Sequence, residues 1–203
     1  PAMPVTKLSD IRLVCFDLTF LPLVEKLAPL CPGVTAWIAL TDRAHLPQTT
    51  LANLLCYEDL LAAENDDYDW PLFDENTAAG LCYTSGTTGH PKGVLFSHRS
   101  SVLHAYAVSL PDAKGYSARS VVLPIVPMFH VNAWGIPYAA PLAGVKLVLP
   151  GAGMDGASLY ELFETEEVES SAGVPTVWLN LIAHMKQHGL KFSTLKYATI
   201  GGA

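Results

Sequence analysis

The most informative stretch of this 203-residue sequence is Leu81-Cys82-Tyr83-Thr84-Ser85-Gly86-Thr87-Thr88-Gly89-His90-Pro91-Lys92-Gly93. An apolar strand leads here into a loop that contains three glycines, four hydroxyl side chains and one lysine. Glycine permits backbone conformations that are closed to other residues and lets a ligand approach closely. A strand that feeds such a loop directs its backbone N–H groups into a concavity that binds anions. The stretch therefore predicts a loop that holds a chain of phosphates.

Two other loops of similar composition do not fit this stretch. A Walker A loop requires Gly-x-x-x-x-Gly-Lys-Ser/Thr, but Pro91 precedes Lys92 and Gly93 follows it. A nucleophile elbow requires Gly-x-Ser-x-Gly, and Tyr83 occupies the position of its first glycine. These mismatches argue against a P-loop NTPase and against a hydrolase with a serine nucleophile.

The segments on both sides of the loop alternate between strand and helix spacing. The spacing predicts strands at 11–17, 34–40, 81–84, 93–96, 121–126, 145–149, 170–174 and 197–200. It predicts helices at 20–30, 51–63, 97–110, 133–142, 158–167 and 175–188. This order is typical of an α/β fold with a mainly parallel sheet and flanking helices. We expect an α/β segment at 1–45, a connecting segment at 46–77, and an α/β subdomain with the loop at 78–203.

Composition and charge exclude several classes of partner. The net charge is −7 and no Lys/Arg cluster is present, so nucleic acid is not an expected partner. The four cysteines form no C-x-x-C pair, and we expect free thiols in a reducing, cytoplasmic compartment. Residues 120–145 carry no charged side chain of the Asp, Glu, Lys or Arg type, but their four prolines do not suit a membrane helix. We therefore expect no transmembrane segment.

The loop at 84–93 resembles the signature loop of the adenylate-forming superfamily, which includes acyl-CoA synthetases, luciferases and the adenylation domains of peptide synthetases. Three more blocks follow in that family's order: Pro127-Met128-Phe129-His130-Val131-Asn132-Ala133-Trp134-Gly135, Gly173-Val174-Pro175-Thr176-Val177-Trp178, and Gly201-Gly202-Ala203. The Val-Asn-Ala-Trp segment is similar to the medium- and long-chain fatty acyl-CoA synthetases. The resemblance implies a partial N-terminal domain of such an enzyme.

The resemblance also implies a role for each block. ATP would be bound by Thr84, Ser85, Gly86, Thr87, Thr88, Gly89, Lys92, Gly201, Gly202 and Ala203. The Thr84 hydroxyl would contact Mg²⁺, and Lys92 and His130 would be the catalytic residues. The acyl substrate would be bound by His130, Trp134, Val174, Pro175 and Thr176. We expect purely structural roles for His98 and His104.

The reaction that the resemblance implies has two steps. A fatty-acid carboxylate attacks the α-phosphate of Mg-ATP, and the thiol of coenzyme A then converts the acyl-adenylate to a thioester. The family's ribose-binding block and its C-terminal domain are not found in these 203 residues, so we expect a fragment truncated at its C-terminus and inactive on its own. The parent enzyme is a candidate homodimer. The alternatives are a fragment of a fatty acyl-AMP ligase or aryl-CoA ligase, or a non-catalytic nucleotide-binding module.

Overall fold

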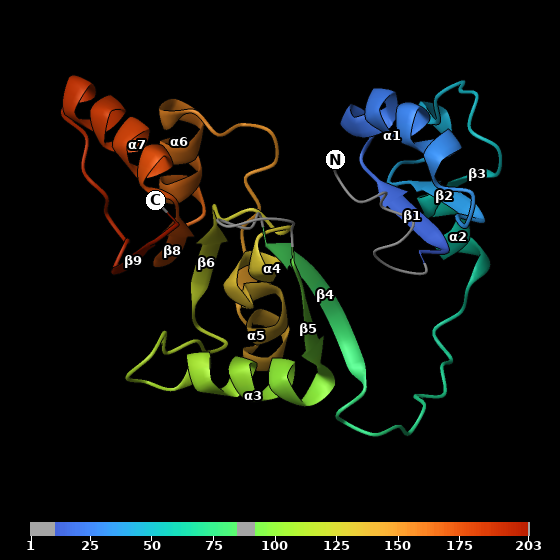
Figure 1. Cartoon of the computed structure of the whole chain (residues 1–203). Coiled ribbons are helices and arrows are strands. Elements are labelled where there is room, and N and C mark those ends of the chain that lie inside the picture. The colour runs from blue at the N-terminus through green and yellow to red at the C-terminus, as the bar shows by residue number, and fades with distance from the viewer. Residues whose placement is uncertain (1–10, 85–91, 203) are drawn as a thin grey trace. The chain divides into compact units, whose positions relative to one another are not determined.

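The computed structural model describes residues 11–84 and 92–202, with Thr84 described by its backbone alone (Figure 1). The chain forms two compact units, of which the first holds residues 11–72 together with Lys92, and the second holds Phe73–Thr84 and 93–202. Strands and helices alternate along both units, and the three-stranded and four-stranded sheets are parallel. The prediction of an α/β fold with mainly parallel sheets and flanking helices is confirmed.

The first unit is built on a small parallel sheet. Its strands are β1 (Leu13–Phe16), β2 (Ala36–Ala39) and β3 (Leu54–Cys56), in the order β1-β2-β3. Its helices are α1 (Leu21–Leu27) and α2 (Tyr57–Ala63), with the 3₁₀ turns η2 (Leu18–Phe20), η3 (Ala28–Leu30) and η4 (Arg43–His45). Every residue of β2 is buried, as expected for a central strand of a parallel sheet that is covered on both faces.

One element of the first unit differs from its prediction. The helix expected at 51–63 begins only at Tyr57, and the strand β3 precedes it. Asn53 has a φ of 57°, which ends any right-handed helix at that point, and the residues after it pair with β2. Tertiary pairing has therefore overridden the apolar spacing of this segment. The division of the chain at residues 45 and 77 stays a prediction.

Among the residues that the structure describes, the second unit contains two sheets and five helices. The strands β4 (Ala78–Thr84) and β5 (Lys92–Ser97) pair with each other. The parallel four-stranded sheet consists of β6 (Val121–Pro124), β7 (Lys146–Leu147), β8 (Ser170–Gly173) and β9 (Tyr197–Ile200), in the order β7-β6-β8-β9. The helices are α3 (His98–Ser109), α4 (Val131–Trp134), α5 (Ile136–Ala143), α6 (Gly156–Thr165) and α7 (Pro175–His188).

The helices cover both faces of the four-stranded sheet. Val122 of β6 packs in one core cluster with residues of α3 and α5. The next residue, Leu123, packs in a second cluster with residues of α6 and α7, which lie side by side (orange and red in Figure 1). Successive side chains of a strand point to opposite faces, so β6 contributes to both cores. Burial on both faces explains why its sequence is continuously apolar.

Local sequence signals account for several helix ends. Ser97 and Ser100 form a reciprocal capping box at the start of α3. Asp155 caps α6 by accepting hydrogen bonds from the backbone of residues 157 and 158. Helix α7 begins at Pro175, and Gly189, which adopts the left-handed conformation with a φ of 65°, caps its end.

The helix predicted at 133–142 is placed too early. The right-handed helix α5 begins at Ile136, with a proline in its first turn. The four residues before Gly135, which form α4, all have φ between 47° and 55°. We call Val131–Trp134 the left-handed turn. Apolar spacing continues through it, which is why periodicity alone does not separate it from the helix.

Candidate functional site

Three of the predicted blocks meet at one edge of the four-stranded sheet. Because β6, β8 and β9 are parallel, their carboxyl ends lie at the same edge. His130 follows β6, Val174 follows β8, and Gly201 follows β9. Moreover, β6 connects to β7 on one side, whereas β8 connects to β9 on the other. Ligands of open α/β sheets bind at such topological switch points, outside the carboxyl ends of the strands.

Close contacts join residues of different blocks at this edge. A Cβ added to Gly201 would stand 3.2 Å from the Trp134 ring, and a Cβ on Gly202 would stand 3.5 Å from Val174. The Gly201 N–H also donates to the carbonyl oxygen of Gly173 at 3.4 Å. Glycine at 201 therefore lets the loop after β9 lie directly against the segment after β6. Sequence spacing alone does not predict these contacts.

The left-handed turn is held by side chains from outside it. Asn132 donates from Nδ2 to the Tyr138 hydroxyl at 3.2 Å, and its Oδ1 accepts from the Cys82 thiol at 3.4 Å. Nε2 of His104 lies 3.4 Å from the carbonyl oxygen of Trp134. Non-glycine residues at positive φ are strained and persist only where their surroundings hold them. Such strain clusters at functional sites, and this turn follows directly on His130 at the switch point.

The predicted acyl-binding residues surround the same edge. His130 is exposed, and its backbone N–H donates to the carbonyl oxygen of Pro127 at 3.0 Å. Trp134, Val174 and Pro175 are half-buried, and Thr176 is exposed in the first turn of α7. The structure thus gathers His130, Trp134 and Val174 at one edge, while their roles toward a ligand stay predictions.

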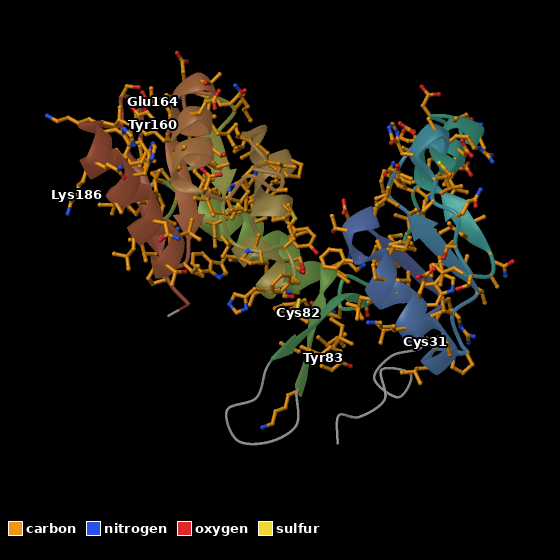
Figure 2. The ribbon with its side chains drawn as sticks, turned by 90° about the horizontal axis from the view of Figure 1, so that it is seen from above. Cys31, Cys82, Tyr83, Tyr160, Glu164 and Lys186 are labelled. Carbon is orange, nitrogen blue, oxygen red and sulfur yellow. The ribbon has the colours of Figure 1, made fainter. Side chains whose placement is uncertain are left out.

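The glycine- and hydroxyl-rich loop lies between β4 and β5. Cys82 and Tyr83 occupy the end of β4 (Figure 2), and Lys92 opens β5 with an exposed side chain. A Cβ on Gly93 would stand 3.1 Å from Leu81 and 3.2 Å from the Tyr83 ring, so the two strands pack closely here. The two strands agree with those predicted at 81–84 and 93–96. The remaining loop positions and the last residue lie outside the described residues: Ser85, Gly86, Thr87, Thr88, Gly89 and Ala203.

Two residues whose pKa values are shifted by burial line a polar cavity. Its volume is about 330 Å³, and its lining includes Lys114, Tyr116 and Lys196. Burial lowers the pKa of Lys114, whose ammonium group contacts the Thr199 hydroxyl, and burial raises the pKa of Tyr116. The same cavity is lined by Ser120, Ser170 and Tyr197, which stand at or directly before the amino ends of β6, β8 and β9, away from the switch point.

A cavity beside the left-handed turn was not expected from the sequence. Its volume is about 250 Å³ and its lining is mostly apolar. Residues around it include Phe96, Ser100, Ser101, His104, Asn132 and Tyr138. His104, for which we expected a purely structural role, thus lines a cavity next to the predicted acyl-binding block. The signal was the spacing of Ser100, Ser101 and His104, which places these polar side chains on one face of α3.

The described part of the chain contains neither a metal-binding cluster nor a membrane-spanning helix. Among residues 11–84 and 92–202, no three His, Cys, Asp or Glu side chains gather where they could hold a metal ion. No helix among the same residues is long and apolar enough to cross a membrane. All four cysteines lie in the described ranges, and each is a free thiol.

Comparison with known proteins shows a matching family model and several similar ligases. The model of the family described as AMP-binding enzyme matches residues 30–203. The 3-methylmercaptopropionyl-CoA ligase of Ruegeria lacuscaerulensis is 47% identical over 192 residues, which are 95% of this chain and 36% of that protein. The medium-chain-fatty-acid–CoA ligase of Ectopseudomonas oleovorans is 47% identical over 195 residues, again 36% of its length. The chain therefore spans about a third of these relatives.

A solved structure agrees with the fold. The N-terminal domain of FACL13 from Mycobacterium tuberculosis superposes with a TM-score of 0.76 and 22% identity, covering 98% of this chain and 47% of that one. At this identity the likeness shows the fold alone. The resemblance to medium- and long-chain fatty acyl-CoA synthetases is confirmed by the curated relatives. With its family model matched over 30–203, the chain belongs to the family of AMP-binding enzymes.

Proposed function

We propose that this chain supplies the phosphate-binding loop and part of the acyl site of an ATP-dependent, AMP-forming acyl-CoA ligase that acts on fatty acids. The observation that carries the proposal is the meeting of the segments around His130, Val174 and Gly201 at one switch point in a chain of this family. The two relatives named above are acyl-CoA ligases whose substrates are a thioether acid and medium-chain fatty acids.

Two segments of the chain would bind ATP. The loop after β4 would bind the β- and γ-phosphates through backbone N–H groups and hydroxyls, with Lys92 adding positive charge. Gly201 and Gly202 would lie against the adenine. The close packing of Gly201 on Trp134 fits this role, because a flat, side-chain-free backbone lets a ring approach. Mg²⁺ would be bound by ATP phosphates together with the Thr84 hydroxyl, a hard oxygen ligand of the kind Mg²⁺ prefers.

The acyl substrate would lie beside His130 and Trp134. The first step needs the carboxylate positioned in line with the α-phosphate, and its charge repulsion reduced. Lys92 suits charge neutralisation, and His130 is exposed at the switch point where it can contact the carboxylate. The adenylate would then react with coenzyme A to give the thioester and AMP. This scheme requires no side-chain nucleophile in the chain.

We also propose a cellular location, an oligomeric state and a division into domains for the whole protein. A cytoplasmic location is supported by four free thiols, which are typical of proteins in reducing compartments. A homodimer is proposed on the family resemblance alone. Residues 78–203 are proposed as the subdomain that carries the site, with 1–45 and 46–77 as the preceding segment and its connection.

The first test is calorimetry of Mg-ATP binding to the 203-residue chain. We expect weak binding that Lys92→Ala lowers by about tenfold or more, as for the loss of a charged hydrogen-bonding group. The matched control is Lys186→Ala, which removes an exposed lysine at the end of α7 (Figure 2) and should leave binding unchanged. Equal affinities of the parent chain and Lys92→Ala would contradict the phosphate-site assignment.

The second test measures activity in a graft. In the graft, residues 11–202 of this chain replace the matching segment of the Ectopseudomonas oleovorans ligase, with which the chain shares 47% identity. We expect octanoate-dependent exchange of pyrophosphate into ATP, followed by formation of octanoyl-CoA. Exchange without thioester would favour an acyl-AMP ligase, and ATP binding without exchange would favour a non-catalytic module. Either result overturns the proposed ligase activity.

A further inference from the structure

The polar cavity at the amino ends of β6, β8 and β9 lies outside the site proposed above. Its lining comes from the loop between α3 and β6, from the start of β8, and from the start of β9. All three segments belong to the second unit. Ligands of open α/β sheets bind at the other, carboxyl edge, so the proposed nucleotide and acyl chemistry does not account for this cavity.

Positive charge is concentrated around the polar cavity. Lys114, Arg119 and Lys196 line it, and Glu169 supplies the one carboxylate among the described residues of its lining. Glu169 is already engaged, because its Oε1 pairs with Nζ of Lys196 at 2.5 Å. Within the described part of the chain, neither Lys114 nor Arg119 takes part in an ion pair. Two cations without a carboxylate partner therefore line one cavity, in a chain whose net charge is −7.

Lys114 is the least solvated of these cations. It is half-buried, whereas Arg119 and Lys196 are exposed. Its ammonium group contacts the Thr199 hydroxyl, a neutral group that does not balance the charge. Burial lowers the pKa of Lys114, as expected for a cation that loses water without gaining a counter-charge. An anion in the cavity would supply that counter-charge.

Neutral hydrogen-bond donors lie among the cations. Oγ of Ser120 accepts from the backbone N–H of Ser117 at 3.1 Å, and Oγ of Ser117 accepts from that of Arg119 at 3.3 Å. The two hydroxyl oxygens are 3.4 Å apart, so at most one of their protons joins them and the other is left for a ligand. Burial raises the pKa of Tyr116, whose phenol therefore stays protonated and adds no negative charge.

We propose that the polar cavity binds a phosphate group, either as inorganic phosphate or at the end of a small phosphate monoester, at a site separate from the loop after β4. A phosphate group brings up to two negative charges and several acceptor oxygens, which match the two unpaired cations and the hydroxyl donor. The planar guanidinium of Arg119 suits bidentate binding of phosphate. The volume of about 330 Å³ lies within the range of about 300–1,000 Å³ typical of small-molecule pockets, which leaves room for the body of a monoester.

Calorimetry with inorganic phosphate and with glycerol 3-phosphate tests the site in the 203-residue chain. Because the loop after β4 is also expected to bind phosphates, every protein compared carries Lys92→Ala, and chloride keeps the ionic strength constant. Arg119→Gln and Lys114→Gln should each weaken binding by about tenfold, as for the loss of a charged hydrogen-bonding group. The matched control is Arg12→Gln, which removes an exposed arginine of the first unit and should leave binding unchanged. Tighter binding of glycerol 3-phosphate would identify a monoester as the ligand, and tighter binding of inorganic phosphate would identify the free ion.

A second readout locates the bound ion. In NMR spectra of the chain with Lys92→Ala, phosphate should shift the amide signals of residues 114–120, 169–170 and 196–197, and chloride at equal ionic strength should not. Equal shifts with chloride would reveal a general ion atmosphere and overturn the inference. No binding of either probe, or unchanged affinity in Arg119→Gln, would also overturn it, and the exposure of Arg119 makes unfolding of that variant unexpected. The inference does not rest on the proposed function, whose own test is the effect of Lys92→Ala on Mg-ATP binding.

Discussion

The Trp134 ring lies against Gly201, where an added Cβ would stand 3.2 Å from the ring. The two residues follow different strands of the four-stranded sheet, β6 and β9, between which β8 lies. Their contact spans the carboxyl end of β8 and brings two predicted ligand-binding blocks together. Such a separation is tighter than ordinary van der Waals contact, so a side chain at 201 would have to displace the indole ring.

Gly201→Ala should therefore destabilise the chain by about 1–3 kcal/mol, as is usual for overpacking. Denaturant unfolding measures this change. Combining it with Trp134→Leu should recover part of the loss, because the smaller side chain leaves room for the new methyl group. Gly33→Ala is the control, since its added Cβ would meet its nearest atom at an ordinary 3.8 Å. Strictly additive effects of the double variant would argue against the contact.

Gly135→Ala should lower the free energy of unfolding by more than the positive φ at this position alone explains. Gly135 has a φ of 76°, and its added Cβ would stand 2.8 Å from Nε2 of His104. We expect about 1–2 kcal/mol from the left-handed conformation and about 1–3 kcal/mol from the clash. Gly151→Ala separates the two contributions, because Gly151 has a φ of 59° but no atom lies within 4 Å of its added Cβ. A loss in Gly135→Ala no greater than in Gly151→Ala would show that His104 is not packed there.

Trp178 should tolerate replacement by phenylalanine. Its side chain is buried, and its Nε1 has no hydrogen-bond partner among the described residues, lying close to Gly173 instead. Removing an unsatisfied buried donor offsets part of the lost packing, so Trp178→Phe should change the free energy of unfolding by less than about 1.5 kcal/mol. Trp178→Ala should cost about 3–5 kcal/mol. The idea is wrong if the phenylalanine variant loses nearly as much stability as the alanine variant.

The stability of α6 should decrease at low pH because the carboxylate of Asp155 becomes protonated. Hydrogen bonds from the Ser158 side chain and backbone, and from the Ala157 backbone, lower the pKa of this carboxylate. A lowered folded-state pKa means that its contribution is present above the ordinary value of 3.8 and is lost as the pH falls through the folded value. Asp155→Asn keeps a capping side chain but removes the titration.

Unfolding free energies from about pH 5 downward, compared between parent and Asp155→Asn, test this expectation. Asp17 and Asp42 also have lowered pKa values, so the parent's overall acid sensitivity includes their contributions. The difference between the two proteins isolates Asp155. Parallel curves, with no loss of the parent's advantage below about pH 4, would show that the cap does not titrate as proposed.

Much of the secondary structure of the second unit could be predicted, because the sequence signals that specify it are local. The bounds of α7 and β9 agree with the predicted 175–188 and 197–200. Proline at the start of a helix and glycine at its end act through their own backbone geometry, and alternation of strands with helices implies a parallel sheet. The order of the blocks was likewise visible, and with it the family, whereas phosphate binding by residues 84–93 stays a prediction.

What the amino-acid order could specify, then, was the class of fold and the family. The left-handed turn and the cavity beside it depended on three-dimensional packing. Asn132 is held by Cys82, a partner 50 positions away in the chain, and Trp134 by His104, a partner 30 positions away. Positive φ at residues such as Val131 opposes local preference, so only distant contacts can stabilise it. Those contacts join residues of different elements, so no pattern of neighbouring residues encodes them.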